Sequence, residues 1–277
     1  MPELPEVETV RRQLAERVTG RAITGLEVRD EKFSSPATPQ ELAAEVVGRR
    51  IVAVGRRGKY LLMRLDSGDD FVVHLRMTGR LHWSAGGPAG DERFVRAVIG
   101  LDDGGTLTFS DMRRFGRGWI VPAEPDPEAY WAGRVGVEPL DPGFTPVVLA
   151  GLLRGRRGPV KAVLLNQALV AGLGNIYADE ALFAAGVHPE RSAGDLDRHE
   201  VARLHEAIVD RLKVAVEAGG SSIDSYRDSL GNYGSMQDRL RVHLHRGDPC
   251  PRCGDTVVKT RVAQRGTYWC PTCQVNR

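Results

Sequence analysis

The hydrophobic pattern changes period along the chain. Residues 5–18 have apolar side chains every three or four positions, which predicts an amphipathic helix with Pro5 in its first turn; the apolar positions are Val7, Val10, Leu14 and Val18. From Ile23 to Pro122, short β-branched runs alternate with Gly and Asp clusters. The expected strands include 50–54, 60–65, 71–75, 94–101 and 106–109. This pattern indicates an antiparallel sandwich or barrel.

A proline-rich connection follows the predicted strands. Six of the sixteen prolines lie between residues 122 and 146, a stretch that cannot form one long helix. Beyond it the apolar spacing becomes helical again and predicts helices at 147–153, 160–169, 176–185 and 197–218. From Arg241 onward the alternation is strand-like, so we expect His243 and His245 to be strand residues rather than metal ligands. The pattern predicts two domains and a small appendage.

Composition excludes several classes of protein. The chain has 277 residues, of which 42% are hydrophobic and 27% charged, as in ordinary globular proteins. The longest uncharged stretch, 162–178, contains polar residues and is shorter than the ~20 apolar residues that a membrane span requires. The start, MPELPEVETV, lacks the basic and apolar regions of a signal peptide. We therefore predict a cytoplasmic protein without a membrane partner.

Charge becomes informative only when it is followed along the chain. The net charge is +2, yet residues 46–65 contain six cations and no acid, and residues 151–161 contain four cations and no acid. The tail at 231–277 has eight cations against three acids. Basic stretches in both domains predict a polyanion bound between them, although each stretch alone is also compatible with a solvated surface.

The four cysteines indicate a metal site. They form two matched pairs with two residues inside each pair and sixteen between the pairs: Cys250, Cys253, Cys270 and Cys273. This spacing is typical of structural zinc, because each pair forms a turn whose two thiolates bind the same tetrahedral ion. A redox pair or two disulfides is the alternative. Strands at 256–262 and 267–269 would form a hairpin with Arg265 at its tip.

The amino terminus carries candidate chemistry. Removal of the initiator Met would leave Pro2 as a secondary amine, with an expected pKa of about 7.7 to 8.0 and hence a neutral, nucleophilic fraction near neutral pH. Glu3 is adjacent and Glu6 lies one helical turn further on. An amine with a carboxylic acid can attack a sugar carbon and protonate the leaving group. The alternative is a plain helix start whose glutamates complement the helix dipole.

Five segments in order resemble the bacterial formamidopyrimidine-DNA glycosylases: MPELPEVETVRR, RRGKYLL, DMRRFG, AGLGNIYADEALFAAGVHP and AQRGTYWCPTC. The resemblance implies an α+β fold with an N-terminal β-sandwich and leading helix at 1–130, a helix-two-turn-helix domain at 131–238 and a zinc-finger β-hairpin at 239–277. It also implies a monomeric, bacterial base-excision repair enzyme, associated with the nucleoid through its DNA. Such an enzyme removes 8-oxoguanine and formamidopyrimidines from double-stranded DNA and then cleaves the strand as a lyase.

The resemblance also assigns catalytic roles. Pro2 corresponds to the nucleophile that attacks C1′ and becomes an iminium, and Glu3 to its general acid and base. Lys59 corresponds to the lysine that binds phosphate and assists elimination. Arg265 corresponds to the zinc-hairpin arginine that grips phosphates beside the lesion.

The remaining assignments concern DNA contacts. Met77, Arg113 and Phe115 correspond to the residues that fill the gap left by an extruded base. His74 and Arg156 resemble further backbone contacts, while Asn175 is expected to cap the helix from 176 and bind phosphate. Glu180 is expected to be a buried acid that serves structure or shapes the active site. Where relatives often have a DNA-contacting His, this chain has Asp91-Glu92-Arg93.

Two other hypotheses remain open. One is an endonuclease VIII-like glycosylase for oxidised pyrimidines, which typically has Gly at the position of Leu4. The other is a non-catalytic zinc-containing protein that binds lesions without cutting. Retention of Met1 would favour the latter, because a blocked Pro2 cannot attack.

Overall fold

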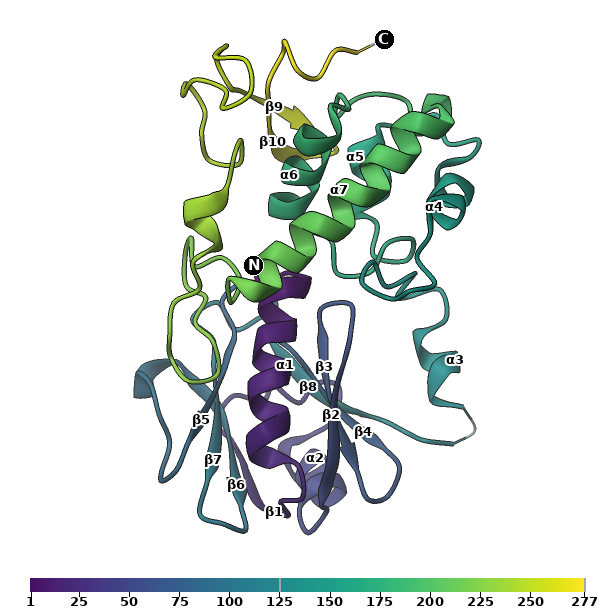
Figure 1. Ribbon diagram of the computed structural model, residues 1–277. Coiled ribbons are helices and arrows are strands. Elements are labelled where there is room, and N and C mark those ends of the chain that lie inside the picture. Colours follow the sequence, from purple (N-terminus) through teal and green to yellow (C-terminus); the bar gives the residue numbers. More distant parts are fainter. Residues whose placement is uncertain (125, 277) are drawn as a thin grey trace. The chain divides into compact units, whose positions relative to one another are not determined.

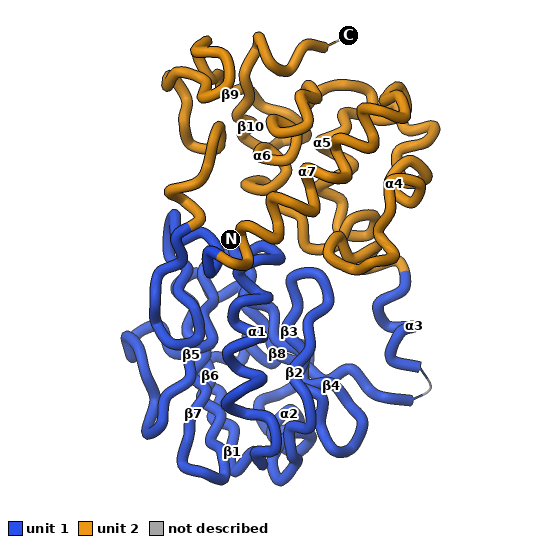
Figure 2. Tube along the Cα trace, viewed as in Figure 1, with its two compact units in different colours: residues 1–132, 218–235 blue, residues 133–217, 236–277 orange. Residues whose placement is uncertain are grey.

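The computed structural model describes residues 1–124 and 126–276, which form two compact units. The first unit contains residues 1–132 and 218–235, and the second contains residues 133–217 and 236–277 (Figure 2). The first unit is therefore built from two separate stretches of the chain.

The first unit is a sandwich of two four-stranded antiparallel sheets (Figure 1). One sheet has the order β1 (Ile23–Val28), β6 (Val95–Leu101), β7 (Thr106–Ser110), β5 (Arg80–Ser84). The other has the order β2 (Ile51–Arg57), β3 (Tyr60–Leu65), β4 (Asp70–His74), β8 (Arg117–Val121). The short helices of this unit are α2 (Pro39–Val46), η1 (Glu92–Phe94) and α3 (Pro127–Trp131).

Helix α1 (Leu4–Val18) belongs to the same hydrophobic core as the sheets. Its apolar stripe is fully buried and packs mainly along β2, whereas its charged residues lie on other faces. Burying one stripe of a helix against a sheet is the arrangement that the spacing in residues 5–18 predicts. The predicted sandwich with a leading helix is confirmed.

The second unit is helical and carries the hairpin. Its α-helices are α4 (Pro146–Leu153), α5 (Val160–Leu165), α6 (Asn175–Ala185) and α7 (Arg198–Glu217), with short 3-10 turns η2 (Ala193–Asp195) and η3 (Met236–Arg239). Strands β9 (Val258–Val262) and β10 (Arg265–Trp269) pair antiparallel. Helix α6 packs against both α7 and β10, so it connects the helical part of this unit to the hairpin.

Several expectations need correction. Strands β1, β5 and β8 were not among the predicted runs, and α5 ends at Leu165 rather than at 169. Residues 240–249 form turns and one isolated bridge residue instead of a strand. The hairpin turn contains only Ala263 and Gln264, both with positive φ, which is the geometry of a tight two-residue turn. Arg265 is therefore the first residue of β10, directly after the tip.

Candidate active site and metal centre

The start of α1 gathers buried carboxylates at the amino terminus. Pro2 is buried, and Glu3 and Glu6 are 3% and 1% exposed. The Glu6 carboxylate accepts hydrogen bonds from the backbone N–H of Glu3 (2.8 Å) and of Ser221 (2.7 Å). The partial positive charge at a helix N-terminus favours anions at this position. Removal of the exposed Met1 would leave the Pro2 nitrogen as an amine next to these acids.

The second stretch of the first unit, residues 218–235, is tied to α1. The Tyr226 hydroxyl donates to the Glu6 carbonyl (3.2 Å), and the Gln13 side-chain oxygen accepts from the backbone N–H of Ser229 (3.0 Å). Gly220 has φ +80° and lies so close to Glu6 that an added Cβ would come within 2.8 Å of Glu6 Cγ. Hydrogen bonds to the Glu6 carboxylate and the Gln13 side-chain amide therefore hold the segment over the start of α1, and Gly220 allows the close approach.

Two of the three predicted gap-filling residues line a cavity at the amino terminus. The cavity has a volume of about 390 Å³ and is lined by Met1, Met77, Thr78, Arg80, Met112, Arg113, Asp224 and Ser225. Phe115 is not in its wall but is 49% exposed, with the Arg113 guanidinium 4.9 Å from its ring centroid. A half-exposed phenylalanine is costly in water, and stacking by a cation partly covers it.

Asp111, which the sequence did not single out, organises this region. Its buried carboxylate accepts hydrogen bonds from the backbone N–H groups of Arg113 (3.1 Å), Phe115 (2.8 Å) and Gly116 (2.7 Å) and from the Thr78 hydroxyl. Thr78 directly follows Met77. One carboxylate therefore fixes both loops that carry the three gap-filling side chains. Its place at the start of DMRRFG was the signal available in the sequence.

Lys59 lies in the turn between β2 and β3, directly before Tyr60, which pairs with His74 of β4; Lys59 and His74 are both 6% exposed. Burial lowers the pKa of His74 to about 3, with smaller contributions from the positive charges of Arg76 and Lys59. His74 is consequently neutral at physiological pH. Its Nδ1 accepts a hydrogen bond from the Arg76 backbone N–H (2.8 Å), so the proton resides on Nε2. His74 can therefore act as a neutral hydrogen-bond donor to a phosphate.

In the second unit, Asn175 and Lys161 both hold the backbone beside Arg265. The Asn175 side-chain amide (2.9 Å) and the Lys161 ammonium (3.2 Å) donate to the Gly266 carbonyl. Gly174, not Asn175, is the N-cap of α6, so the predicted capping role of Asn175 is wrong. Asn175 is instead the first helical residue and links α6 to the hairpin.

A buried charged network lies behind this contact. Lys161 and Asp179 are 0% and 1% exposed, and Lys161 Nζ lies 2.6 Å from Asp179 Oδ1. The other carboxylate oxygen of Asp179 lies 2.8 Å from His243 Nδ1. Lys161 also donates to the Thr267 hydroxyl of β10 (2.8 Å). Paired, hydrogen-bonded charges are the form in which ions are tolerated in a core.

Glu180 has a structural role in this unit. Its fully buried carboxylate accepts hydrogen bonds from the backbone N–H groups of Arg241 (3.0 Å), Val242 (3.0 Å) and His243 (2.9 Å). These bonds fix the turn that follows η3. The turn also places His243 beside Asp179, although His243 had been expected in a strand.

The two predicted phosphate-binding arginines of the second unit are exposed. Arg265 projects from the first position of β10, and Arg156 lies in the turn after α4, where its Nε donates to the Leu152 carbonyl (2.7 Å). Exposure leaves both guanidinium groups accessible to an anion.

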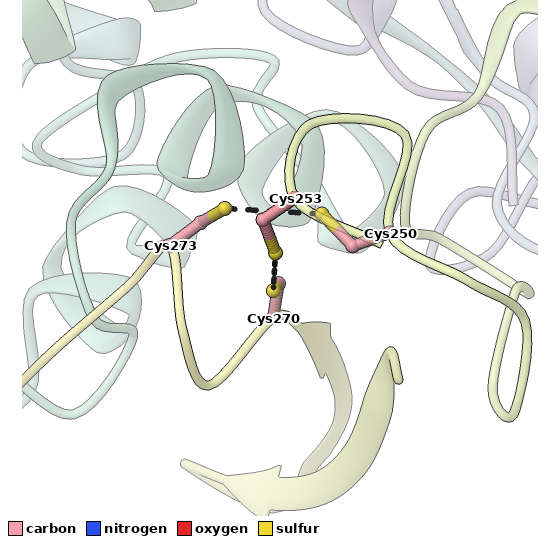
Figure 3. A group of neighbouring side chains, drawn as sticks. All are labelled: Cys250, Cys253, Cys270 and Cys273. Atoms are coloured by element: carbon pink, nitrogen blue, oxygen red, sulfur yellow. Dashed lines mark hydrogen bonds between the residues drawn. The ribbon is translucent and has the colours of Figure 1, made fainter. Parts of the chain in front are cut away.

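The four cysteines converge as the spacing predicts (Figure 3). Their sulfur atoms all lie within 4.8 Å of one another, with Cys250 and Cys273 separated by 3.8 Å and Cys253 and Cys270 by 3.5 Å. Four thiolates at ~2.3 Å from a tetrahedral zinc ion would be about 3.8 Å apart, so the residues fit the metal. The donor set is that of one structural zinc with a closed shell, not of a catalytic metal.

Family comparisons agree with this organisation. The chain matches the formamidopyrimidine-DNA glycosylase N-terminal domain at residues 1–118 and the formamidopyrimidine-DNA glycosylase H2TH domain at residues 135–227. Residues 247–275 match the zinc finger found in FPG and IleRS. In the described residues, no helix is both long and apolar enough to cross a membrane.

Full-length relatives support the same conclusion. Formamidopyrimidine-DNA glycosylases from Symbiobacterium thermophilum and Pelotomaculum thermopropionicum are 49% and 46% identical, over 99% of this chain and 89% and 99% of theirs. The structure of Lactococcus lactis Fpg with abasic-site DNA has a TM-score of 0.90 at 36% identity, covering 99% of both chains. The wild-type complex with N7-benzyl-Fapy-dG DNA has a TM-score of 0.91.

The sandwich unit, the helical unit and the four-cysteine hairpin together define a DNA glycosylase with a structural zinc finger. The chain belongs to the formamidopyrimidine-DNA glycosylase family.

Proposed function

We propose that this chain is a bifunctional base-excision enzyme that acts on double-stranded DNA. It removes 8-oxoguanine and formamidopyrimidines and then cleaves the strand at the abasic site. The observation that carries this function is the cavity of about 390 Å³ in which Met1 lies with Met77 and Arg113. Pro2, the proposed nucleophile, directly follows Met1 in the chain, and two gap-filling side chains line the same cavity as Met1.

The chemistry follows from a secondary amine beside an acid. The Pro2 nitrogen attacks C1′ while the bond from C1′ to the base breaks, and the departing base takes a proton from Glu3. The proton of the attacking nitrogen then passes to O4′ as the C1′–O4′ bond breaks, which opens the sugar ring and gives the iminium. The iminium acidifies the C2′ proton, whose removal by the Glu3 carboxylate drives loss of the 3′ phosphate. A second elimination releases the 5′ phosphate. Water then hydrolyses the iminium and frees Pro2.

The remaining predicted residues serve binding. Lys59 and the neutral His74 of the first unit would contact phosphates, and so would Arg156, Asn175 and Arg265 of the second. Charged and polar donors to phosphate position the enzyme without reading sequence. Met77, Arg113 and Phe115 would occupy the gap that base extrusion leaves in the duplex.

Borohydride trapping tests the covalent step. The mature chain is expected to form a reduced protein–DNA adduct on an 8-oxoguanine duplex, with peptide mass spectrometry locating the adduct on Pro2. A chain with one Gly retained before Pro2 has an amide there and should form no adduct. Glu3→Gln should slow excision about 100-fold or more, the range for general acid catalysis. Glu16→Gln, an exposed change on the same helix, is the control.

The outcomes separate the alternatives. An adduct formed by the Gly-extended chain would overturn the role of Pro2. Faster excision of thymine glycol than of 8-oxoguanine would place the chain with the endonuclease VIII-like enzymes. Lesion binding without any adduct would indicate a non-catalytic lesion-binding protein.

We also propose that the enzyme acts as a monomer on chromosomal DNA in a bacterial cytoplasm. The bacterial relatives and the DNA substrate support this location. A single species of about 30 kDa in sedimentation is the expected result.

A further inference from the structure

Arg114 lies between Arg113 and Phe115 in the turn at 111–116, yet its side chain has a different partner. Its guanidinium donates two hydrogen bonds to the Asp30 carboxylate, from Nε to Oδ2 (2.6 Å) and from Nη2 to Oδ1 (2.9 Å). The Arg113 guanidinium instead lies over the Phe115 ring. Two parallel bonds between a guanidinium and a carboxylate fix their relative orientation as well as their distance. Asp30 therefore holds the middle of the turn from a segment 84 residues earlier in the chain.

The backbone of Arg114 has a conformation that requires support. Its φ of +58° lies in the left-handed region, which residues with a side chain rarely adopt. The Asp111 carboxylate binds the backbone N–H groups of Arg113 and Phe115, on either side of Arg114. The ion pair with Asp30 stabilises the residue between these two bonds, and so helps to keep the whole turn in one conformation.

Asp30 is itself held in place by the neighbouring sheet. It follows β1, and its side chain is 8% exposed. Its Oδ1 accepts a hydrogen bond from the Lys32 backbone N–H (3.2 Å), and the preceding Arg29 N–H donates to the Arg96 carbonyl of β6 (2.8 Å). The hydrogen bonds from Arg114 lower the pKa of Asp30, so this carboxylate is ionised near neutral pH. Asp30 is thus a fixed and charged acceptor for Arg114.

We propose that Asp30, acting through Arg114, positions Arg113 and thereby sets how well the enzyme discriminates between bases opposite the lesion. A guanidinium in the gap can donate to two acceptors of cytosine, O2 and N3, whereas adenine presents an amino donor beside one acceptor. This contrast requires a fixed guanidinium, because a mobile one can turn to suit either base. Asp30 is a positioning residue, since it acts on the opposite base only through the turn. The inference rests on the proposed function, which places Arg113 in the gap.

The test compares excision of 8-oxoguanine opposite cytosine and opposite adenine by the full-length enzyme. Asp30→Asn and Arg114→Gln each break the ion pair and are expected to reduce the cytosine-to-adenine ratio of kcat/KM by about 5-fold, the lower end of the range for one good polar pair to a base. The double variant should show no further reduction, because both changes remove the same interaction. Arg114→Lys keeps the charge without the two parallel bonds and should give an intermediate ratio.

Asp70→Asn is the matched control. Asp70 and Arg64 form a pair of the same geometry in the other sheet, with Nε 2.6 Å from Oδ1 and Nη2 3.0 Å from Oδ2. In both pairs the acid is buried and the arginine is about half exposed. Asp70→Asn is expected to lower the melting temperature about as much as Asp30→Asn, but to keep the wild-type ratio.

The results distinguish this inference from the function on which it rests. Reduced ratios in both single variants, with no further reduction in the double variant and a wild-type ratio in Asp70→Asn, support the positioning role. An unchanged ratio in Asp30→Asn or in Arg114→Gln overturns it while the glycosylase function stands. Additive losses in the double variant, or an equal loss in Asp70→Asn, also overturn it, because Asp30 would then not act through Arg114 or would act only on stability. A wild-type enzyme without excision or trapping would overturn the proposed function as well.

Discussion

The turn at 111–116 and the β9–β10 hairpin each present an arginine, but they are held by different means. In the first unit, the carboxylate of Asp111 accepts hydrogen bonds from three backbone N–H groups and one hydroxyl, which fix the turn that bears Arg113. In the second unit, the cysteine site holds the base of the hairpin, and Lys161 holds the backbone next to Arg265. Both turns also contain non-glycine residues with positive φ.

The difference has a physical origin. The turn at 111–116 lies on a large sheet core, where Phe109 packs so closely that a Cβ at Gly116 would lie 2.2 Å from its ring. Local hydrogen bonds suffice there because the sandwich supplies the stability. The hairpin has only two strands and a small hydrophobic cluster, and a two-stranded hairpin is marginal in water. It therefore needs a metal and buried charges.

Metal loss should have the largest effect. The variant Cys253→Ser/Cys270→Ser is expected to lose zinc and unfold residues 247–276, since a structural zinc contributes on the order of 10 kcal/mol in small zinc domains. Hydrogen exchange should show lost protection in the hairpin and retained protection in β2–β4. Metal analysis of the wild type should give one zinc per chain. Full protection of the hairpin without metal would contradict this account.

Replacing Lys161, whose ammonium is buried, should have the second-largest effect. Lys161→Met leaves the Asp179 carboxylate without its cation and is expected to destabilise the hairpin contact by about 3 to 5 kcal/mol. Hydrogen exchange at residues 265–269 measures the loss. Lys213→Met, on the exposed side of α7, is the matched control. If both lysine variants behaved alike, the buried pair would have no part in holding Arg265.

The corresponding change in the first unit should cost less. Asp111→Asn keeps the shape but replaces a charged acceptor with a neutral amide, at an expected cost of about 2 kcal/mol. Exchange at residues 113–116 should accelerate, and discrimination of the base opposite the lesion should weaken as Arg113 becomes mobile. Asp66→Asn provides an exposed control. Unchanged exchange at 113–116 would show that the sheet alone fixes the turn.

The smallest effect is expected for Thr78→Val. This change removes a hydroxyl that donates to Asp111 and accepts from the Arg113 backbone N–H (3.1 Å), at a cost of about 1 kcal/mol. The melting temperature of the first unit should fall by about 2 to 4 °C. A larger fall than that of Asp111→Asn would reverse the order of importance within this turn.

The periodic elements were predictable because burial alone sets their pattern. The stripe of α1 and the alternation in β3 and β6 required no knowledge of partners. Strands β1, β5 and β8 lacked such runs: β8 reads Arg-Gly-Trp-Ile-Val and gains its conformation from pairing with β4. The conformation of such segments is set by pairing with other strands, which a local sequence pattern does not show.

In the candidate site, too, some residues could be predicted from the sequence, while others depend on tertiary contacts. The cysteines were predictable because metal geometry constrains their spacing, and the catalytic assignments came from motif resemblance. The motif DMRRFG contains Asp111, but the motif could not show what this carboxylate binds, since its partners are mostly backbone N–H groups that any sequence supplies. The pairing of Lys161 with Asp179 escaped notice because it depends on how α5 packs against α6.

The return of residues 218–235 to the first unit has a consequence for synthesis on the ribosome. The sandwich strands and α1 are complete by residue 132, yet Glu6 and Gln13 bind partners near residues 221–229. About 100 further residues must be translated before these partners emerge, which takes roughly 5 to 20 s at common elongation rates. During that interval the nascent sandwich carries the buried acids of α1 without their covering segment. The first unit can therefore be finished only after residues 133–217 of the second unit have been made.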